Sequence, residues 1–273
     1  MTSRTLAARP HRLLRQHRWS MMPLAMSLLL SMTPVTRVFA QNAAEHVSLG
    51  DRESTAGRNT AALEHYEMAL KVNPRDYAAL WKSSREAVDL GEAEAVASRR
   101  SALYAKATDY ARRALAINPA DAESHFHLSR ALGRMALTLG VRERVKCAAE
   151  VRAHALRALE LAPTHPGALH IMGVWNAEVL RLGGMQRLFA KTFLGGAVFE
   201  SASWAEATRY MEQSVASEPD RLVHRLDLAR VYRDSKRVPE ARAAFQAALK
   251  AANLDPNDAM YRKAAETELA ALR

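Results

Sequence analysis

The sequence of 273 residues contains a single cysteine, Cys147. One thiol cannot form a disulfide within the chain, so the fold must rest on its apolar core in any redox compartment. Cys147 lies in the helix-like run VKCAAEV, where we expect it to act as a small buried apolar residue. A reactive thiol is the alternative.

Aromatic residues are also scarce, at 6% of the chain. A β-sandwich or β-barrel would need more aromatic and β-branched residues, whereas the frequent Ala, Leu, Glu and Arg favour helices. Apolar residues make up 49% and charged residues 25%, which is an ordinary globular composition and excludes a disordered chain. The sequence therefore predicts an all-α protein of one or two domains.

Motifs of catalysis and metal binding are missing. The chain lacks H-E-x-x-H, a Gly-rich phosphate loop ending in Gly-Lys-Ser/Thr, G-x-S-x-G and C-x-x-C. His125 and His127 suggest a metal pair, but two residues apart on a helix they point about 200° away from each other, because a turn takes 3.6 residues. We predict a non-enzymatic protein with no cofactor and no metal.

Acidic residues are absent from residues 1–40, which hold six arginines. The whole chain carries a formal net charge of +10, but after residue 40 there are 33 basic and 29 acidic residues, a net charge of +4. This excess is too small and too dispersed for a nucleic-acid footprint. We therefore expect no nucleic-acid partner.

Residues 1–40 have the three parts of a signal peptide. A basic stretch reaches Arg18, an uncharged run extends from Met21 to Met32, and Val38-Phe39-Ala40 fits a peptidase site. The apolar run is too short to span a bilayer comfortably. A mitochondrial transit peptide is the alternative, but such peptides interleave Arg with apolar residues. We predict cleavage after Ala40 and export to the bacterial periplasm or the medium, with no transmembrane segment in the processed chain.

A repeated pattern organises the rest of the sequence. Ala is followed by an apolar or aromatic residue four positions on, by a small residue three further, and by Pro five further. The offsets of four and three place these side chains on one helical face, and the Pro ends the helix. The five copies start at Ala62, Ala107, Val151, Ala207 and Ala241, and the last has Asn253 in place of Pro.

A second helix begins after each Pro and carries a large residue beside a small one at a common phase, as in Leu128-Ser129 and Met172-Gly173. This alternation resembles the tetratricopeptide repeat, a helix-turn-helix unit of about 34 residues that stacks into a right-handed α-solenoid. The implied domain is 41–273, with repeats at about 43–76, 77–121, 122–165, 166–221 and 222–255, and a capping helix at 258–272.

Three repeats are longer than the standard unit. The additions to the second and third are helical in composition, so we expect lengthened helices there. The fourth addition, MQRLFAKTFL, lies between Gly183-Gly184 and Gly195-Gly196 and predicts a short amphipathic helix. Its apolar face holds Met185, Leu188, Phe189 and Phe193. It is either a lid over the groove or an extra packed helix of the fourth repeat.

The C-terminal part has a narrower resemblance. The strings HIMGVWNAEV (170–179), LFAKTFLGG, SWAEATRYMEQSVASEPD and LARVYRDSKRVPEARAAFQAALKAA resemble the regulator of microtubule dynamics family, most clearly over residues 165–272. The resemblance implies the tetratricopeptide fold and a ligand-holding groove. Members of that family are described as microtubule-associated, and one is an organelle-contact tether whose repeat domain carries phospholipid.

Function in such solenoids lies on the concave face, which the first helix of each repeat lines. Two rows are predicted there, an aromatic and apolar row and a row rich in arginine. They comprise Trp81, Phe126, His170 and Leu226, and Arg85, Arg130, Val174 and Arg230. Arginine suits carboxylate and phosphate groups. We therefore predict an adaptor that binds a peptide or protein partner in its groove, with a carrier of phospholipid or another apolar anion as the alternative.

Overall fold

The computed structural model of this protein describes residues 34–183 and 197–272. Within these ranges every regular element is a helix, which confirms the all-α class. The helices are α1 (Pro34–Thr55), α2 (Asn59–Val72), α3 (Tyr77–Ala93), α4 (Ala97–Ile117), α5 (Ala122–Ala136), α6 (Val141–Leu161), α7 (Pro166–Arg181), α9 (Ala197–Glu200), α10 (Trp204–Ser217), α11 (Leu222–Asp234), α12 (Val238–Lys250) and α13 (Asp258–Ala271). The predicted insert helix with Met185, Leu188, Phe189 and Phe193 lies outside the described residues.

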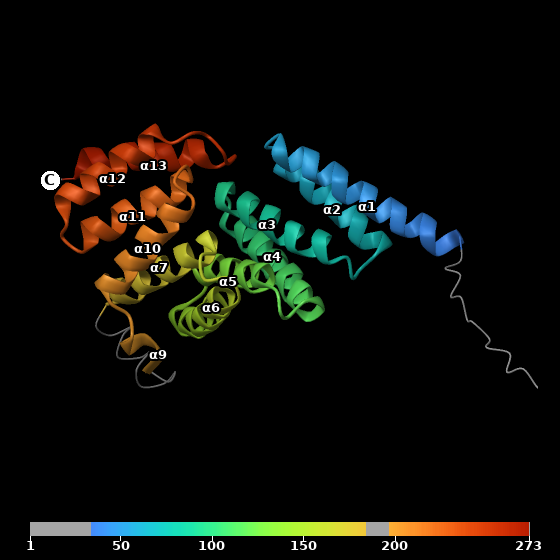
Figure 1. Ribbon diagram of the computed structural model, residues 1–273, viewed down its shortest axis with the longest axis horizontal. Coiled ribbons are helices and arrows are strands. Elements are labelled where there is room, and N and C mark those ends of the chain that lie inside the picture. Colours follow the sequence, from blue (N-terminus) through green and yellow to red (C-terminus); the bar gives the residue numbers. More distant parts are fainter. Residues whose placement is uncertain (1–33, 184–196, 273) are drawn as a thin grey trace, which may run out of the picture.

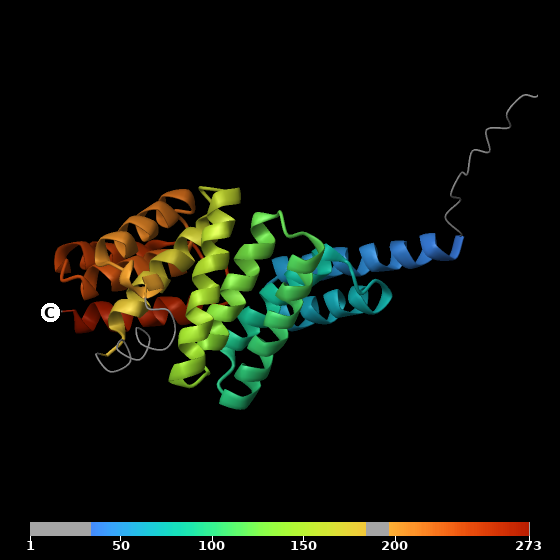
Figure 2. The same ribbon diagram turned by 90° about the horizontal axis from the view of Figure 1, so that it is seen from below.

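Consecutive helices pack as pairs that follow one another along the chain (Figures 1 and 2). The pairs are α1 with α2, α3 with α4, α5 with α6, α7 with α10, and α11 with α12. The first helices of successive pairs also contact one another. Helix α3 lies against α1 and α5, and α7 lies against α5 and α11. These first helices therefore form the inner layer of the solenoid, and the second helices lie outside.

A repeated Asn-Pro-x-Asp turn starts two of the inner helices. Before α3 the carboxylate of Asp76 accepts a hydrogen bond of 2.9 Å from the amide of Ala79, and Asp121 occupies the same place before α5. Such a cap pairs an amide that the helix leaves free, and the preceding Pro cannot continue the earlier helix. The turn therefore fixes where each outer helix ends and the next inner helix begins.

Small residues set the close contact within each pair. A Cβ added at Gly91 of α3 would lie 2.5 Å from Cε1 of Tyr104 on α4, and one at Gly173 of α7 would lie 2.6 Å from Cγ of Met211 on α10. Tyr104 and Met211 are both buried. The large residue of one helix thus fills the space that glycine leaves on its neighbour, and for Gly173 and Met211 the repeated pattern predicts this contact.

The length differences lie where the sequence predicts them. The outer helices α4 and α6 have 21 residues each, whereas α2 has 14. At the far end α13 packs against α11 and α12, and Ala265 and Leu272 join the core cluster that these helices share. No helix in the described part of the chain is long and apolar enough to cross a membrane.

Candidate functional site

The inner face near the start of the solenoid centres on Trp81. Its half-buried indole stacks on the ring of His127 from α5, with ring centroids 5.0 Å apart. The ammonium of Lys82 and the guanidinium of Arg85 each lie 5.5 Å from the centroid of the indole. Trp81 is therefore held between an imidazole and two cations, a geometry in which cations favour the π-face of the ring.

Phe126 continues this group of rings toward α7. Its ring lies 4.8 Å from that of His127 and 4.6 Å from that of His165, and it packs over Gly167. Glu123 joins the two histidines, at 3.4 Å from His127 and 3.1 Å from His165. Burial of the ring lowers the pKa of His127 to about 4, although Glu123 opposes the shift, so His127 is neutral at pH 7.

Arg85 already has partners within the chain. Its guanidinium lies 2.8 Å from the carboxylate of Glu86 and donates a 2.9 Å hydrogen bond to the hydroxyl of Ser54 on α1. Glu86 is almost fully buried, so the arginine compensates a carboxylate that water cannot reach. Arg85 therefore holds α3 to α1 as well as facing the inner surface.

Arg130 lies deeper and pairs with two acids of α3. Its guanidinium is 2.5 Å from Asp89 and 3.7 Å from Glu92. Burial raises the pKa of Asp89 to about 6, although Arg130 counteracts the shift. Burial alone would lower the pKa of Arg130, but Asp89 and Glu92 hold it above its ordinary value. One turn on, Nε of Arg134 lies 2.7 Å from Glu92, within ion-pair distance although its N–H does not point at that oxygen.

The inner face of α7 and α11 also carries histidine and arginine side chains paired with carboxylates. Nε2 of His170 lies 2.8 Å from Asp227, and the ring of His170 stacks on that of His224. Arg230 pairs with Asp227 at 2.9 Å and with Glu268 of α13 at 2.5 Å. The carboxylates thus connect α7, α11 and α13 along the inside of the solenoid.

Two predicted site residues are core residues rather than polar contacts. Val174 is half-buried and packs against the cluster formed by α7, α10 and α11. Leu226 is fully buried in the cluster of α11, α12 and α13, so the prediction that it lines a groove is corrected. The reason is the capping helix, because α13 covers the face that α11 would otherwise present.

The predicted arginine row is paired within the chain. Each of Arg85, Arg130 and Arg230 has a carboxylate partner. The sequence interpretation missed those acids. Asp89 and Glu92 follow Arg85 at offsets of four and seven on one face of α3, a spacing that could have indicated them.

The remaining candidates from the sequence are His125, His127 and Cys147. Within the described ranges no three His, Cys, Asp or Glu residues are grouped to hold a metal ion. His125 contacts His154, with their Nδ1 atoms 2.9 Å apart, whereas His127 contacts Trp81, so the two point apart as predicted. Cys147 is half-buried, and burial raises the pKa of its thiol, so it stays protonated at pH 7.

Two cavities stand out in the described part of the chain. One of about 500 Å³ lies between the start of α2, the end of α3 and the turn at Pro256 and Asn257. The other, of about 320 Å³, lies between α10 and the turn from α11 to α12, and Trp204, Arg209 and Arg237 help to line it. Neither cavity extends along the predicted arginine row from Arg85 to Arg230.

Comparison with known proteins identifies the family of this chain. The family described as regulator of microtubule dynamics protein 1-3 matches residues 46–273. The chain belongs to the regulator of microtubule dynamics family. It is 24% identical to the mouse regulator of microtubule dynamics protein 1 over 142 residues, which cover 52% of this chain and 46% of that protein. It is 22% identical to bovine protein 3 over 188 residues, 67% of this chain and 39% of that one.

The chain thus matches less than half the length of these family members. Among solved structures, a thermophilic tetratricopeptide-repeat protein of Thermus thermophilus is similar in fold, with a TM-score of 0.60 and 24% identity. The superposition covers 82% of this chain and 99% of that one. The family and the tetratricopeptide-repeat solenoid predicted from the sequence are both confirmed.

Proposed function

We propose that this family member is a non-enzymatic adaptor that binds an acidic segment of a protein partner on its inner face. The observation that carries the proposal is the setting of Trp81, which lies on the inner layer between Lys82, Arg85 and His127. Tryptophan and arginine dominate the binding energy of protein interfaces, because each combines a large contact area with a polar group. A partner that covers Trp81 therefore meets the guanidinium of Arg85 on the same surface, whereas Lys82 is paired with the more exposed Asp51.

The ion pairs on the inner face favour an acidic partner. Arg85, Arg130 and Arg134 keep between 19% and 32% of their side-chain surface exposed, whereas the acids Glu86, Asp89 and Glu92 are less than 10% exposed. The guanidinium groups are thus more accessible than the carboxylates that neutralise them. Glutamate or aspartate side chains of a partner can add to these cations without burying a new unpaired charge.

A phospholipid is the other ligand class that the family resemblance implies. An acyl chain needs a continuous apolar lining, but the described inner face is crossed by the pairs Arg130–Asp89, His170–Asp227 and Arg230–Glu268. These polar groups support the protein-partner function over the carrier function. Mass spectrometry of an organic extract of the purified protein separates them, because a co-purifying stoichiometric phospholipid would establish the carrier.

The proposed site of action is outside the cytoplasm, on the basis of the leader at residues 1–40. Helix α1 begins at Pro34, so cleavage after Ala40 removes its first turns and leaves residues 41–55. Ala43, three residues after the proposed cleavage site, is 2% exposed, so the retained part of α1 still packs against the core. Sequencing of the mature N-terminus tests this, and an intact Met1 start would remove the export proposal.

A peptide library provides the test of the adaptor function. Displayed random peptides selected on the full protein should be enriched in Glu and Asp, and the selected peptides should lose about tenfold or more in affinity on Trp81→Ala or Arg85→Ala. Arg142→Ala, which changes an exposed arginine on the outer helix α6, is the matched control and should bind as the wild type does. Equal binding by all variants, or failure to select any peptide, would overturn the proposal.

A further inference from the structure

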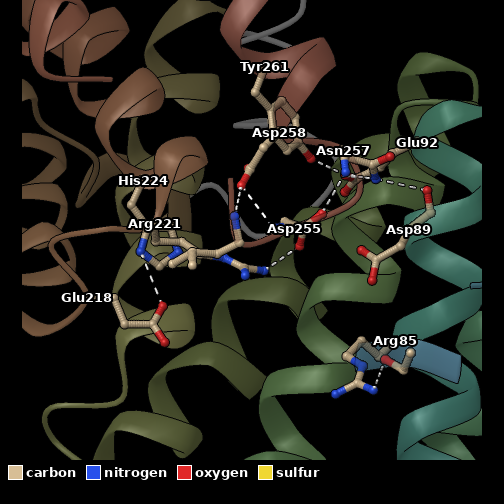
Figure 3. A network of polar contacts seen from close by, with 12 residues as sticks. Arg85, Asp89, Glu92, Glu218, Arg221, His224, Asp255, Asn257, Asp258 and Tyr261 are labelled. Atoms are coloured by element: carbon tan, nitrogen blue, oxygen red, sulfur yellow. Dashed lines mark hydrogen bonds and ion pairs between the residues drawn. The ribbon is translucent and has the colours of Figure 1, made fainter. Parts of the chain in front are cut away.

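The C-terminal turn and α13 contact α3 of the second helix pair through polar side chains. Residues of the turn before α13 and of α13 itself reach back to α3, about 170 positions earlier in the chain (Figure 3). Nδ2 of Asn257 donates to the carbonyl oxygen of Asp89 at 3.0 Å, and the hydroxyl of Tyr261 donates to the carboxylate of Glu92. Pro256 lies beside Gly57 in the turn between α1 and α2, since a Cβ at Gly57 would be 3.7 Å from Cγ of Pro256.

The turn that makes these contacts is held by hydrogen bonds within itself. The carboxylate of Asp258 accepts hydrogen bonds from the amides of Leu254 and Asp255, at 2.8 and 2.9 Å, and that of Asp255 accepts from the amide of Asn257 at 2.9 Å. Arg221 at the start of α11 pairs with Asp255 at 2.8 Å. Residues 254–261, which we term the clasp, therefore present Asn257 and Tyr261 to α3 in a fixed conformation.

The junction between the clasp and α3 lacks the apolar seam found elsewhere. The core cluster that contains residues of α3 includes no residue of α13, and the cluster of α11, α12 and α13 includes none of α3. The cavity of about 500 Å³ lies at this junction, where Asp89 and Asn257 line it. Exchanging these few buried hydrogen bonds for bonds to water costs less than exposing an apolar seam, so this junction can open while the helix pairs stay folded.

Glu92 joins the clasp to the inner face. The same carboxylate receives Tyr261 from the clasp and pairs with Arg134 and Arg130 of α5. Burial opposes its ionisation, but Arg134, Arg130 and Tyr261 hold the pKa of Glu92 below its ordinary value, so it is a carboxylate at pH 7. An acid that takes over Arg134 would leave Glu92 buried with less cationic compensation, which is costly, and opening the junction would relieve that cost by letting water reach the carboxylate.

We infer that residues 254–261 are an intramolecular clasp, which joins the C-terminal part of the solenoid to α3 and opens when an acidic partner displaces Glu92 from Arg134. The opening of the clasp by an acidic partner rests on the proposed function. The closed state is independent of that function. Because linkage is reciprocal, a partner that opens the clasp must bind more tightly once the clasp is already broken. The clasp is thus an autoinhibitory contact on the adaptor's own inner face.

Crosslinking tests the closed state without any partner. Ala93 and Pro256 are both exposed and line the same cavity, so Ala93→Cys with Pro256→Cys, in a Cys147→Ala background, should be joined by a short bismaleimide. Adding Asn257→Ala and Tyr261→Phe should slow crosslinking about tenfold, because two hydrogen bonds are lost. Tyr232→Phe is the matched control, since Tyr232 donates to Glu212 away from the clasp, and it should change nothing. Equal crosslinking rates with and without the clasp contacts would overturn the clasp.

Binding of a labelled heptaglutamate peptide tests the coupling. The Asn257→Ala/Tyr261→Phe protein should bind it about tenfold more tightly than wild type, and the crosslinked protein about tenfold more weakly. Heptaglutamine is the uncharged control. Unchanged affinity after crosslinking would overturn the coupling but not the adaptor function. Absence of heptaglutamate binding in every variant would overturn the proposed trigger, while the crosslinking rates would still decide whether the clasp exists.

Discussion

The seams between neighbouring helices and the inner face of the solenoid are built from different side chains. In the seams, glycine and alanine meet large apolar or aromatic residues, as Gly91 meets Tyr104 and Gly173 meets Met211. On the inner face, arginines meet carboxylates, as Arg130 meets Asp89 and Arg230 meets Glu268. The seams recur with the repeat, whereas each ion pair occurs in one place.

This difference separates stability from specificity. An apolar seam gains free energy from any partner of the right size, so one simple pattern can serve every repeat. A buried ion pair gains little net free energy, but it costs several kcal/mol when one partner is removed. The inner face therefore constrains which groups can bind there more than it stabilises the fold. Four predictions test this division, beginning with the largest expected effect.

Leu128→Ala should destabilise the protein by about 2–5 kcal/mol, because it removes methyl groups from a fully packed seam and leaves a cavity. Leu128 is 1% exposed in the cluster that α3, α4 and α5 share. Urea unfolding followed by circular dichroism measures the change. Leu137→Ala is the control, since Leu137 at the end of α5 is 53% exposed and should lose less than about 0.5 kcal/mol.

Arg130→Ala should cost about 2–4 kcal/mol, because Asp89 and Glu92 remain buried without their shared cation. The double variant Arg130→Ala/Asp89→Asn should recover part of this loss, since it also removes a stranded charge. The same unfolding measurement applies, with Arg142→Ala on the outer surface as control. A loss no larger than that of the control would show that the inner face is a solvated surface.

Gly91→Ala should destabilise the protein by about 1–3 kcal/mol, although alanine is the better helix former. The added methyl group would lie 2.5 Å from the buried ring of Tyr104, which has little room to move. Gly183→Ala serves as control, because a Cβ there meets no atom of the described residues within 4 Å. A gain in melting temperature for Gly91→Ala would contradict the close seam.

His127→Gln should make the stability less dependent on pH. The pKa of His127 is about 4 in the fold and 6.5 unfolded, so the unfolded chain binds the proton first, and stability falls as the pH drops below 6.5. The wild type should lose about 1–2 kcal/mol more than His127→Gln between pH 7.5 and pH 5.

The pH dependence of the wild type must be compared with that of His127→Gln, because Asp89 changes the stability with pH in the opposite direction to His127. The pKa of Asp89 is raised to about 6 in the fold, so protonation near pH 6 favours the folded state and adds stability as the pH falls. Asp89 contributes nearly equally to the wild type and to His127→Gln, so its effect cancels in the difference. Parallel pH profiles for the two proteins would contradict a neutral, buried His127.

Much of the fold could be predicted because its pattern is local and repeated. The phase of Ala62, Tyr66 and Ala69 indicates one face of one helix, and Pro74 indicates its end. Five copies of such a pattern determine the packing of neighbours, since each helix contacts mainly those next to it in sequence. The same phase placed Trp81, Phe126 and His170 on the inner layer.

The rest of the site depended on contacts between distant parts of the chain. The repeat phase could not show that α13 covers Leu226, or that Tyr261 reaches Glu92 on α3. Small rotations between successive repeats accumulate into the curvature that brings α13 to α3, and no single repeat encodes that sum. The sequence by itself determined the helices, their pairing and the inner layer. Only the tertiary structure decided which charges meet there, because ion pairing depends on distances across the whole turn of the solenoid.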